Sequence, residues 1–142
     1  MSHFIQIGTS EMYGSVDRPS LETDPILPSS PYAASKVAFD MYLLSVSRFL
    51  NFPMNIIRPC NAYCPGQLLH RVIPKTIVLG RKGEKLPLHG GGKAEKSYIH
   101  ARDLGRAIYL LSQTDIRGEV FNVGAEKPTS IKDVVAHCAD AL

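Results

Sequence analysis

The chain has little of what membrane-spanning and secreted proteins need. It holds no apolar run near the roughly 18 residues that cross a bilayer. Its N-terminal apolar stretch, residues 4–7, is shorter than the core of about 7 residues or more that a signal peptide requires. We therefore expect a protein that does not contact membranes and that works in the cytoplasm.

Cysteine is also scarce, because the 142 residues include only Cys60, Cys64 and Cys138. An odd number this small cannot build a disulfide framework, which fits a reducing cytosol. Cys60 and Cys64 lack a second Cys or His pair at the spacing of zinc ligands. We therefore expect no metal site.

Charge of one sign is not in large excess. Sixteen Lys and Arg residues stand against thirteen Asp and Glu residues, and the net charge of +3 is dispersed along the chain. This distribution does not favour nucleic acid as a partner. Hydrophobic residues make up 44% of the chain and charged residues 20%, so it can form a core. The length is that of one compact domain.

Apolar periodicity predicts strands that alternate with helices. The expected elements are strand 4–8, helix 31–50, strand 54–58, a helix through 73–78, an extended piece at 97–100, a helix through 104–111, strand 119–123 and a helix from 131 onward. This order predicts an α/β fold with a mostly parallel sheet. Ligands of such sheets usually bind beyond the carboxyl ends of the strands.

The expected helix at 31–50 has the clearest local signals. Ser30 can cap its unpaired amides, and Pro31 loses no intrahelical hydrogen bond at the first helical position. Apolar residues then recur at helical spacing, which is typical of a helix with one face on a core. This stripe comprises Ala34, Val37, Ala38, Met41, Leu44 and Phe49.

Two polar segments follow the first two expected strands. Thr9, Ser10 and Glu11 come directly after the first strand, and a polar loop at 61–66 follows the second. Because the carboxyl ends of parallel strands meet at one edge of a sheet, both segments are expected where ligands bind.

Tyr32 and Lys36 are four residues apart and share one face of the expected helix. A lysine cation beside a phenol lowers the pKa of the phenol, which would let Tyr32 exchange a proton with a substrate hydroxyl near neutral pH. The lysine could also bind the ribose of a cofactor. The spacing alone equally fits a surface tyrosine and lysine without a catalytic role, since about 0.3 such pairs arise by chance in this composition.

Together, these side chains suit the oxidation of an alcohol by hydride loss. Thr9 would orient the hydroxyl, Tyr32 would accept its proton, and Lys36 would tune Tyr32. Glu11 could then remove the acidic proton beside the new carbonyl and drive an elimination. The alternative for Glu11 is a solvated charge at a turn.

Three motifs stand in order along the chain. They are Gly8-Thr9-Ser10-Glu11-Met12-Tyr13-Gly14, then Pro28 with Pro31-Tyr32-Ala33-Ala34-Ser35-Lys36, and then Ile57-Arg58-Pro59-Cys60-Asn61-Ala62-Tyr63. In this order they resemble the extended short-chain dehydrogenase/reductase family. The resemblance is nearest to nucleotide-sugar 4,6-dehydratases, with 4-epimerases and nucleotide-sugar decarboxylases as relatives. Segments 71–74, 86–90, 97–103 and 121–124 also have counterparts in the family.

The resemblance implies an α/β chain that forms the C-terminal half of a Rossmann-like parallel sheet plus part of a small substrate-binding subdomain. Residues 1–66 would belong to the NAD-binding domain and carry the Tyr/Lys helix. Residues 67–142 would mainly bind the nucleotide sugar, with strands and helices that return to the sheet. The resemblance further implies NAD as the cofactor, a nucleotide-diphosphate sugar as the substrate, and a homodimer.

The resemblance also implies the site residues. The catalytic ones would be Thr9, Ser10, Glu11, Tyr32 and Lys36. Contacts with NAD would come from Tyr32, Lys36, Pro59 and Asn61, and contacts with the nucleotide sugar from Asn61, Leu86, Leu88, His89 and Lys96. In a 4,6-dehydratase, a hydride leaves sugar C4, Glu11 removes the C5 proton, and water departs. Ser10 stands where dTDP-glucose dehydratases carry an aspartate that helps the hydroxyl to leave.

One motif of such enzymes is missing from the sequence. It contains no G-x-G-x-x-G or G-x-x-G-x-x-G turn, which would place a pyrophosphate on a helix N-terminus. We expect a middle-to-C-terminal portion of the enzyme, either a fragment or a chain whose other half comes from another chain. The alternatives to a 4,6-dehydratase are a 4-epimerase or decarboxylase of the same family, and a catalytically silent fragment that binds only sugar nucleotide or a partner chain.

Overall fold

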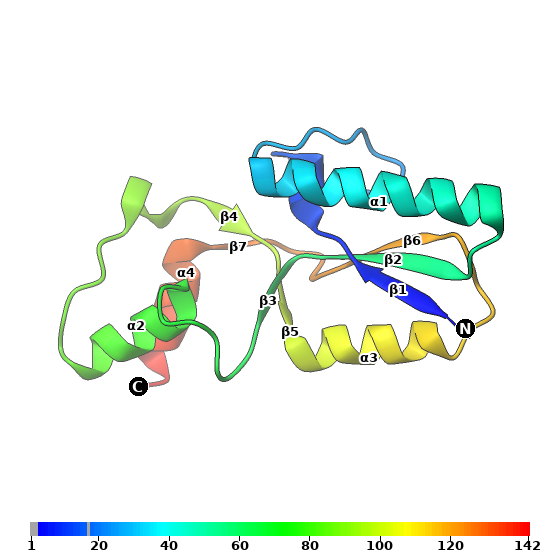
Figure 1. Cartoon of the computed structure of the whole chain (residues 1–142). Helices are drawn as coiled ribbons and strands as arrows, with labels where there is room; N and C mark the ends of the chain where they lie inside the picture. The colour runs from blue at the N-terminus through cyan, green and yellow to red at the C-terminus, as the bar shows by residue number, and fades with distance from the viewer. Residues whose placement is uncertain (1–2, 17) are drawn as a thin grey trace.

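A parallel three-stranded sheet forms the centre of the larger part of the molecule (Figure 1). The computed structural model describes residues 3–16 and 18–142. The strands are β1 (Phe4–Ile7), β2 (Met54–Pro59) and β6 (Val120–Val123), in the order β1-β2-β6. Helix α1 (Pro31–Leu50) covers one face and α3 (Ala101–Ser112) the other. The expected α/β class with a parallel sheet is confirmed.

Helix α1 begins and ends as its local sequence predicts. The Ser30 hydroxyl accepts a hydrogen bond from the Ala33 amide at 3.1 Å, and Pro31 is the first helical residue. The helix ends at Asn51, whose φ of 53° is left-handed. Asparagine tolerates this conformation better than most residues, because its short polar side chain can bond locally.

The buried face of α1 differs from the predicted apolar stripe, and that prediction was wrong. Ala33, Asp40 and Leu43 are buried, whereas Met41 is 41% exposed and Phe49 is 85% exposed. Of the remaining stripe residues, Ala34 and Ala38 are exposed, and Val37 and Leu44 are half-buried. Apolar residues lie almost all around this helix, so its pattern did not single out one face. The rotation follows from Asp40, which forms a buried ion pair with β2.

The core lies between α1 and the sheet. Leu43, Met54 and Ile56 form its buried centre. The partly buried side chains packed against this centre are Phe4, Leu44, Phe52 and Val120. Five consecutive residues of β2 are buried, as expected for a central strand with helices on both faces.

A smaller part of the chain extends from the carboxyl end of the sheet (Figure 1). It contains the parallel pair β3 (Asn61–Tyr63) and β5 (Tyr98–His100), and the antiparallel pair β4 (Glu95–Lys96) and β7 (Thr129–Ser130). Helices α2 (Val72–Arg81) and α4 (Ile131–Asp140) pack against each other. The assignment of residues 1–66 and 67–142 to two functional portions stays a prediction.

The expected polar loop at 61–66 is a strand over its first three residues. Its backbone pairs with β5, because both the amide and the side-chain nitrogen of Asn61 donate to the Ser97 carbonyl, at 3.2 and 3.1 Å. Two single-turn helices complete the structure, η1 (Ser10–Tyr13) and η2 (His89–Gly92).

Two features are absent from the residues that the structure describes. No helix within residues 3–16 and 18–142 has both the length and the apolarity that crossing a bilayer requires. In the same part of the chain, no three His, Cys, Asp or Glu side chains are grouped so that they could hold a metal ion.

A polar contact ties β1 to β2 at their amino ends. Asn55, which is fully buried, lies with its side-chain nitrogen 2.9 Å from His3 Nε2. The same nitrogen donates to the Ile116 carbonyl at 2.8 Å, and its Oδ1 accepts from the Glu119 amide at 3.0 Å. Burial and the nearby Arg117 charge lower the pKa of His3. Because an amide nitrogen can only donate, His3 must be neutral at Nε2 to accept.

We expect stability to fall as the pH drops below about 6.5, since the folded pKa of His3 lies below the unfolded value and the unfolded chain binds more protons. Urea unfolding between about pH 7.5 and pH 5.5 measures this. His3→Ala should flatten the dependence, whereas His89→Ala, at an exposed position, should leave it. Equal slopes in all three proteins would contradict the assignment.

Candidate active site

The polar segment after β1 folds into η1. Thr9 precedes the turn, and its Oγ1 accepts a hydrogen bond from the Glu11 amide at 3.3 Å. Gly14 ends the turn with a φ of 72°, a conformation that a side chain disfavours. In this turn, Ser10 is half-buried and Glu11 is exposed. Thr9, which precedes it, is only 7% exposed.

A buried polar network holds η1 against the sheet. Arg58, 2% exposed at the end of β2, donates from Nε to Asp40 Oδ2 of α1 at 3.3 Å and from Nη1 to the Tyr13 hydroxyl at 2.7 Å. The Tyr13 hydroxyl donates in turn to Asn122 Oδ1 of β6 at 2.9 Å. The Arg58 guanidinium also lies 5.4 Å from the centre of the Tyr13 ring, within cation–π range. This network connects the strands β2 and β6 with the helix α1 and the turn η1.

The network leaves no room for a side chain at the end of β1. A Cβ at Gly8 would stand 2.9 Å from Asp40 Oδ2 and 3.3 Å from Arg58 Cγ. Burial raises the pKa of Asp40, and the hydrogen bond and charge of Arg58 act in the opposite direction. Since Asp40 Oδ1 has no hydrogen-bond partner within the described residues, Arg58 provides most of the compensation for this buried carboxylate.

The network continues to the loop after η1. The Asn122 amide donates to Glu22 Oε1 at 2.7 Å, and its side chain donates to the Ser20 carbonyl at 2.9 Å. These bonds hold the loop over the outer edge of β6. They therefore fix the position of the segment that follows η1.

An open cavity of about 990 Å³ lies at the carboxyl end of the sheet. Its wall includes Cys60 and Gly124, which come directly after β2 and β6, and Ser10, three residues after β1. Four predicted site residues meet there, Ser10 and Glu11 from η1, Asn61 from β3, and Lys96 from β4. The structure thus brings polar groups from three separate segments onto one surface.

The other predicted site residues do not line this cavity. Thr9 is buried beneath η1, and Pro59 is half-buried at the end of β2. On α1, Tyr32 is 56% exposed, and Lys36 Nζ donates to the Ile7 carbonyl at 2.5 Å. The predicted nucleotide-contacting residues Leu86, Leu88 and His89 lie before and within η2. For these residues, contact with NAD or sugar nucleotide stays a prediction.

Sequence reasoning missed the residues that position η1. The sequence pattern predicts a helix at Asp40 and a strand at Arg58, and it assigns neither residue a role of its own. A signal was present, because a charged residue in a buried strand requires a partner. The partner could not be found from spacing alone, since Asp40 and Arg58 are 18 residues apart and Tyr13 and Asn122 are 109 apart.

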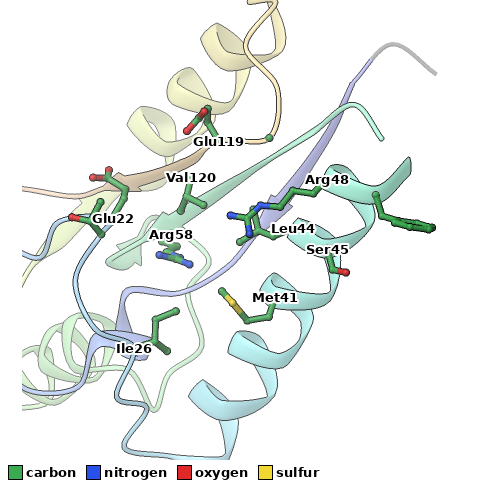
Figure 2. A pocket seen from close by; sticks show the side chains of 12 residues that line it. Glu22, Ile26, Met41, Leu44, Ser45, Arg48, Arg58, Glu119 and Val120 are labelled. Carbon is green, nitrogen blue, oxygen red and sulfur yellow. The ribbon is translucent and has the colours of Figure 1, made fainter. Parts of the chain in front are cut away.

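A second cavity, about 700 Å³, contains none of the predicted site residues. It lies between α1, the loop at 22–26 and β6. Figure 2 shows Met41 and Arg48 on the α1 side, Ile26 on the loop and Val120 on the strand. Its lining is mainly apolar, and it lies apart from Ser10, Glu11, Asn61 and Lys96.

The fold is that of an α/β protein with a cavity at the carboxyl ends of its parallel strands. The sequence model of the NAD dependent epimerase/dehydratase family matches residues 1–124. The chain therefore belongs to this family, as the motifs predicted.

One relative is a trifunctional UDP-glucose 4,6-dehydratase/UDP-4-keto-6-deoxy-D-glucose 3,5-epimerase/UDP-4-keto-L-rhamnose-reductase from Arabidopsis thaliana. It is 33% identical over 135 residues, which make up 92% of this chain and 20% of that protein. The chain thus spans a fifth of the length of this relative.

Solved structures match nearly the whole chain. The dTDP-glucose 4,6-dehydratase of Bacillus anthracis in complex with NAD superimposes with a TM-score of 0.90 at 31% identity, over 96% of this chain and 44% of that one. The UDP-N-acetylglucosamine 4-epimerase of Methanobrevibacter ruminantium gives 0.92 at 28% identity, over 99% and 46%. The chain thus covers less than half of each of these enzymes.

The buried ion pair gives a direct test of the network. We expect Asp40→Ala to lower the free energy of unfolding by about 3–5 kcal/mol at neutral pH, because it leaves the Arg58 charge buried without a counterion. Asp115→Ala, at a fully exposed carboxylate, should cost less than about 1 kcal/mol. Chemical denaturation measures both values. Similar small losses in the two variants would contradict a structural role for the pair.

Proposed function

We propose that this chain is the catalytic and sugar-binding portion of an NAD-dependent nucleotide-sugar 4,6-dehydratase. The observation that carries the proposal is that Ser10 and Glu11 share one cavity with Asn61 and Lys96. A carboxylate able to take a proton thus lies on the same surface as groups that bind anionic ligands. We further propose that residues 1–66 and 67–142 divide the cofactor and substrate contacts, and that the protein works in the cytoplasm.

The residues of α1 and β2 fit the ribose and nicotinamide side of NAD. An ammonium has three N–H donors, and within the described residues Lys36 uses one of them, for the Ile7 carbonyl. Two donors remain for ribose hydroxyls, and Tyr32, one turn earlier, is exposed. Pro59 and Asn61 lie where β2 ends, at the edge of the sheet where cofactors of such folds bind. When bound, NAD supplies a hydride acceptor that later returns the hydride.

The chain's own groups then move the protons. Tyr32 accepts the proton of the sugar C4 hydroxyl as C4 becomes a ketone, with Lys36 favouring the phenolate. Glu11 removes the C5 proton, which the neighbouring ketone has made acidic. The C6 hydroxyl leaves as water by taking up the proton that Glu11 has accepted from C5, and Ser10 donates a hydrogen bond to the departing oxygen. Thr9 acts by capping η1, which holds Ser10 and Glu11 in place.

The charges of the cavity indicate which residues would bind each part of the substrate. Lys96 lies on its wall together with Lys93, so two cations are available to the diphosphate. Asn61, at the start of β3, contributes a further polar group to the same wall. Leu86, Leu88 and His89 would contact the nucleotide base.

A 4-epimerase is the second candidate, favoured by the likeness to the Methanobrevibacter ruminantium enzyme. An epimerase needs the Tyr32 and Lys36 chemistry but no base at C5. The exposed carboxylate of Glu11 in the cavity favours the dehydratase. The role of Glu11 therefore decides between a dehydratase and an epimerase. A fragment without catalysis would show ligand binding alone.

Substrate binding can be measured on the 142-residue chain. We expect NMR titration with UDP-glucose and dTDP-glucose to shift the amide signals of Asn61 and Gly124, which line the cavity. Lys96→Ala should weaken binding about tenfold, equivalent to about 1.4 kcal/mol. Lys85→Ala removes an exposed lysine outside the cavity and should leave the affinity unchanged. Equal affinities in both variants would place the diphosphate elsewhere.

The chemistry can be tested in a complete enzyme that joins this chain to the NAD-binding half of a family member. Tyr32→Phe should lower turnover at least about 100-fold by removing the proton acceptor. Glu11→Gln should block elimination but still permit oxidation at C4, detected as NADH absorbance without release of water. Elimination at the parent rate in the Glu11→Gln variant would overturn the dehydratase in favour of an epimerase or decarboxylase.

A further inference from the structure

An ion pair on the wall of the cavity that contains Glu11 holds Arg18 in one orientation. Arg18 Nη1 donates to Asp24 Oδ2 at 2.9 Å, and Nη2 donates to Asp24 Oδ1 at 2.7 Å. Nη1 also donates to the Pro19 carbonyl at 3.0 Å. Asp24 Oδ2 accepts in turn from the Leu21 amide at 2.8 Å. Together these bonds fix the plane of the guanidinium.

The same bonds leave one complete edge of the Arg18 guanidinium unused. A guanidinium has five N–H groups, and Asp24 and the Pro19 carbonyl engage three of them. The N–H of Nε and the second N–H of Nη2 have no partner within residues 3–16 and 18–142. These two groups form a fork that fits two oxygens of a carboxylate or a phosphate. The side chain is 60% exposed, so a ligand can reach it.

Arg18 belongs to a different segment of the cavity wall from the two lysines. It follows η1 in the chain, whereas Lys93 and Lys96 lie just before β4 and within it. The nearby Ser20 carbonyl accepts a hydrogen bond from Asn122 of β6, which anchors the segment of Arg18 to the sheet. The cavity therefore carries a fixed cation on the segment that follows the turn with the candidate base.

Carboxylates on the same wall decide how an anion binds there. Glu11, Glu95 and Glu126 line the cavity together with the cations. Charges of both signs largely cancel at a distance, so an anionic group is stabilised mainly where a donor bonds it directly. An arginine fork offers such bonds in a fixed geometry, whereas a lysine acts as a point charge. Since Arg58 is committed to the buried network, Arg18 is the arginine of this wall with a free fork.

We propose that Arg18 determines specificity by binding an anionic group of the ligand, through two oxygens of a carboxylate or of a phosphate, on its free fork. Asp24 is a positioning residue, because it holds the guanidinium plane without touching the ligand. The proposal rests on the proposed function in taking the cavity as the site of the nucleotide sugar. The anionic group is either the diphosphate or a carboxylate on the sugar, and ligands with and without a sugar carboxylate separate these two sources.

Titration of the 142-residue chain with UDP-glucose and UDP-glucuronate tests the role of Arg18. Arg18→Ala removes the fork and should weaken binding about tenfold, equivalent to about 1.4 kcal/mol. A loss for both ligands identifies the diphosphate as the bound group, whereas a loss for UDP-glucuronate alone identifies the sugar carboxylate. Arg106→Ala, at an exposed arginine of α3 outside the cavity, is the matched control and should leave both affinities unchanged. Equal affinities of the parent chain and Arg18→Ala for both ligands would overturn the proposal.

Asp24→Asn separates positioning from charge. The variant keeps an oxygen for the Leu21 amide but removes the anion that holds the guanidinium. Loss of a negative charge by itself favours an anionic ligand, so weaker binding is a result that positioning explains and charge does not. We expect an affinity about threefold lower, because Arg18 must then be ordered when the ligand binds. Arg18→Lys should not restore the affinity, since an ammonium has no fork. Tighter binding in Asp24→Asn, or full affinity in Arg18→Lys, contradicts the assignment.

The Nε–H signal of Arg18 in NMR spectra reports on the fork in the unmodified chain. It should move on titration with inorganic pyrophosphate or with glucuronate, which carry the anionic group without the nucleotide. If it moves while the Gly124 amide responds to neither nucleotide sugar, Arg18 binds anions and the proposed function is wrong. If it moves with none of these ligands, the role of Arg18 is wrong, and a response of Gly124 to the nucleotide sugars would still support the proposed function.

Discussion

The ion pair between Arg58 and Asp40 is the constraint on which the rest of the structure depends. Both side chains are almost completely buried, so each charge needs the other. Their pairing fixes the rotation of α1 against β2. Through the Tyr13 hydroxyl, the same guanidinium fixes η1, and through Asn122 the network reaches β6. One buried cation thus links β2 with α1 and η1 directly, and with β6 through Tyr13.

The geometry of the candidate site depends on this network. Glu11 and Ser10 belong to a single turn that starts at a capping threonine and is held from beneath by Tyr13. A turn of this length has too few internal bonds to keep one position by itself. Its polar residues therefore face the cavity because a neighbouring side chain is anchored in the core. The requirement for glycine at position 8 has the same origin, since the Asp40 carboxylate occupies the space of a Cβ.

Sequence reasoning located the three strands of the central sheet, the long helix and its cap, and the polar segments after β1 and β2. It also identified the family, because motifs in fixed order carry more information than one Tyr and Lys pair. It failed on the inner face of α1. The apolar residues of that helix surround it, and the position that decides the rotation is the charged Asp40. The strand Asn61–Tyr63 differs from the expected loop, since its pairing partner lies more than 30 residues away and leaves no local signal.

The sequence by itself determined where elements begin and end, since caps, prolines and apolar periods act over a few residues of backbone. It also determined which chemical groups the chain possesses. Only the tertiary structure decided which of them meet. Ser10, Glu11, Asn61 and Lys96 share a cavity, whereas Tyr32 and Lys36 lie on α1, where Lys36 donates to the Ile7 carbonyl of β1. These outcomes depend on burial and on pairs such as Tyr13 and Asn122, whose separation of 109 residues leaves no local signal.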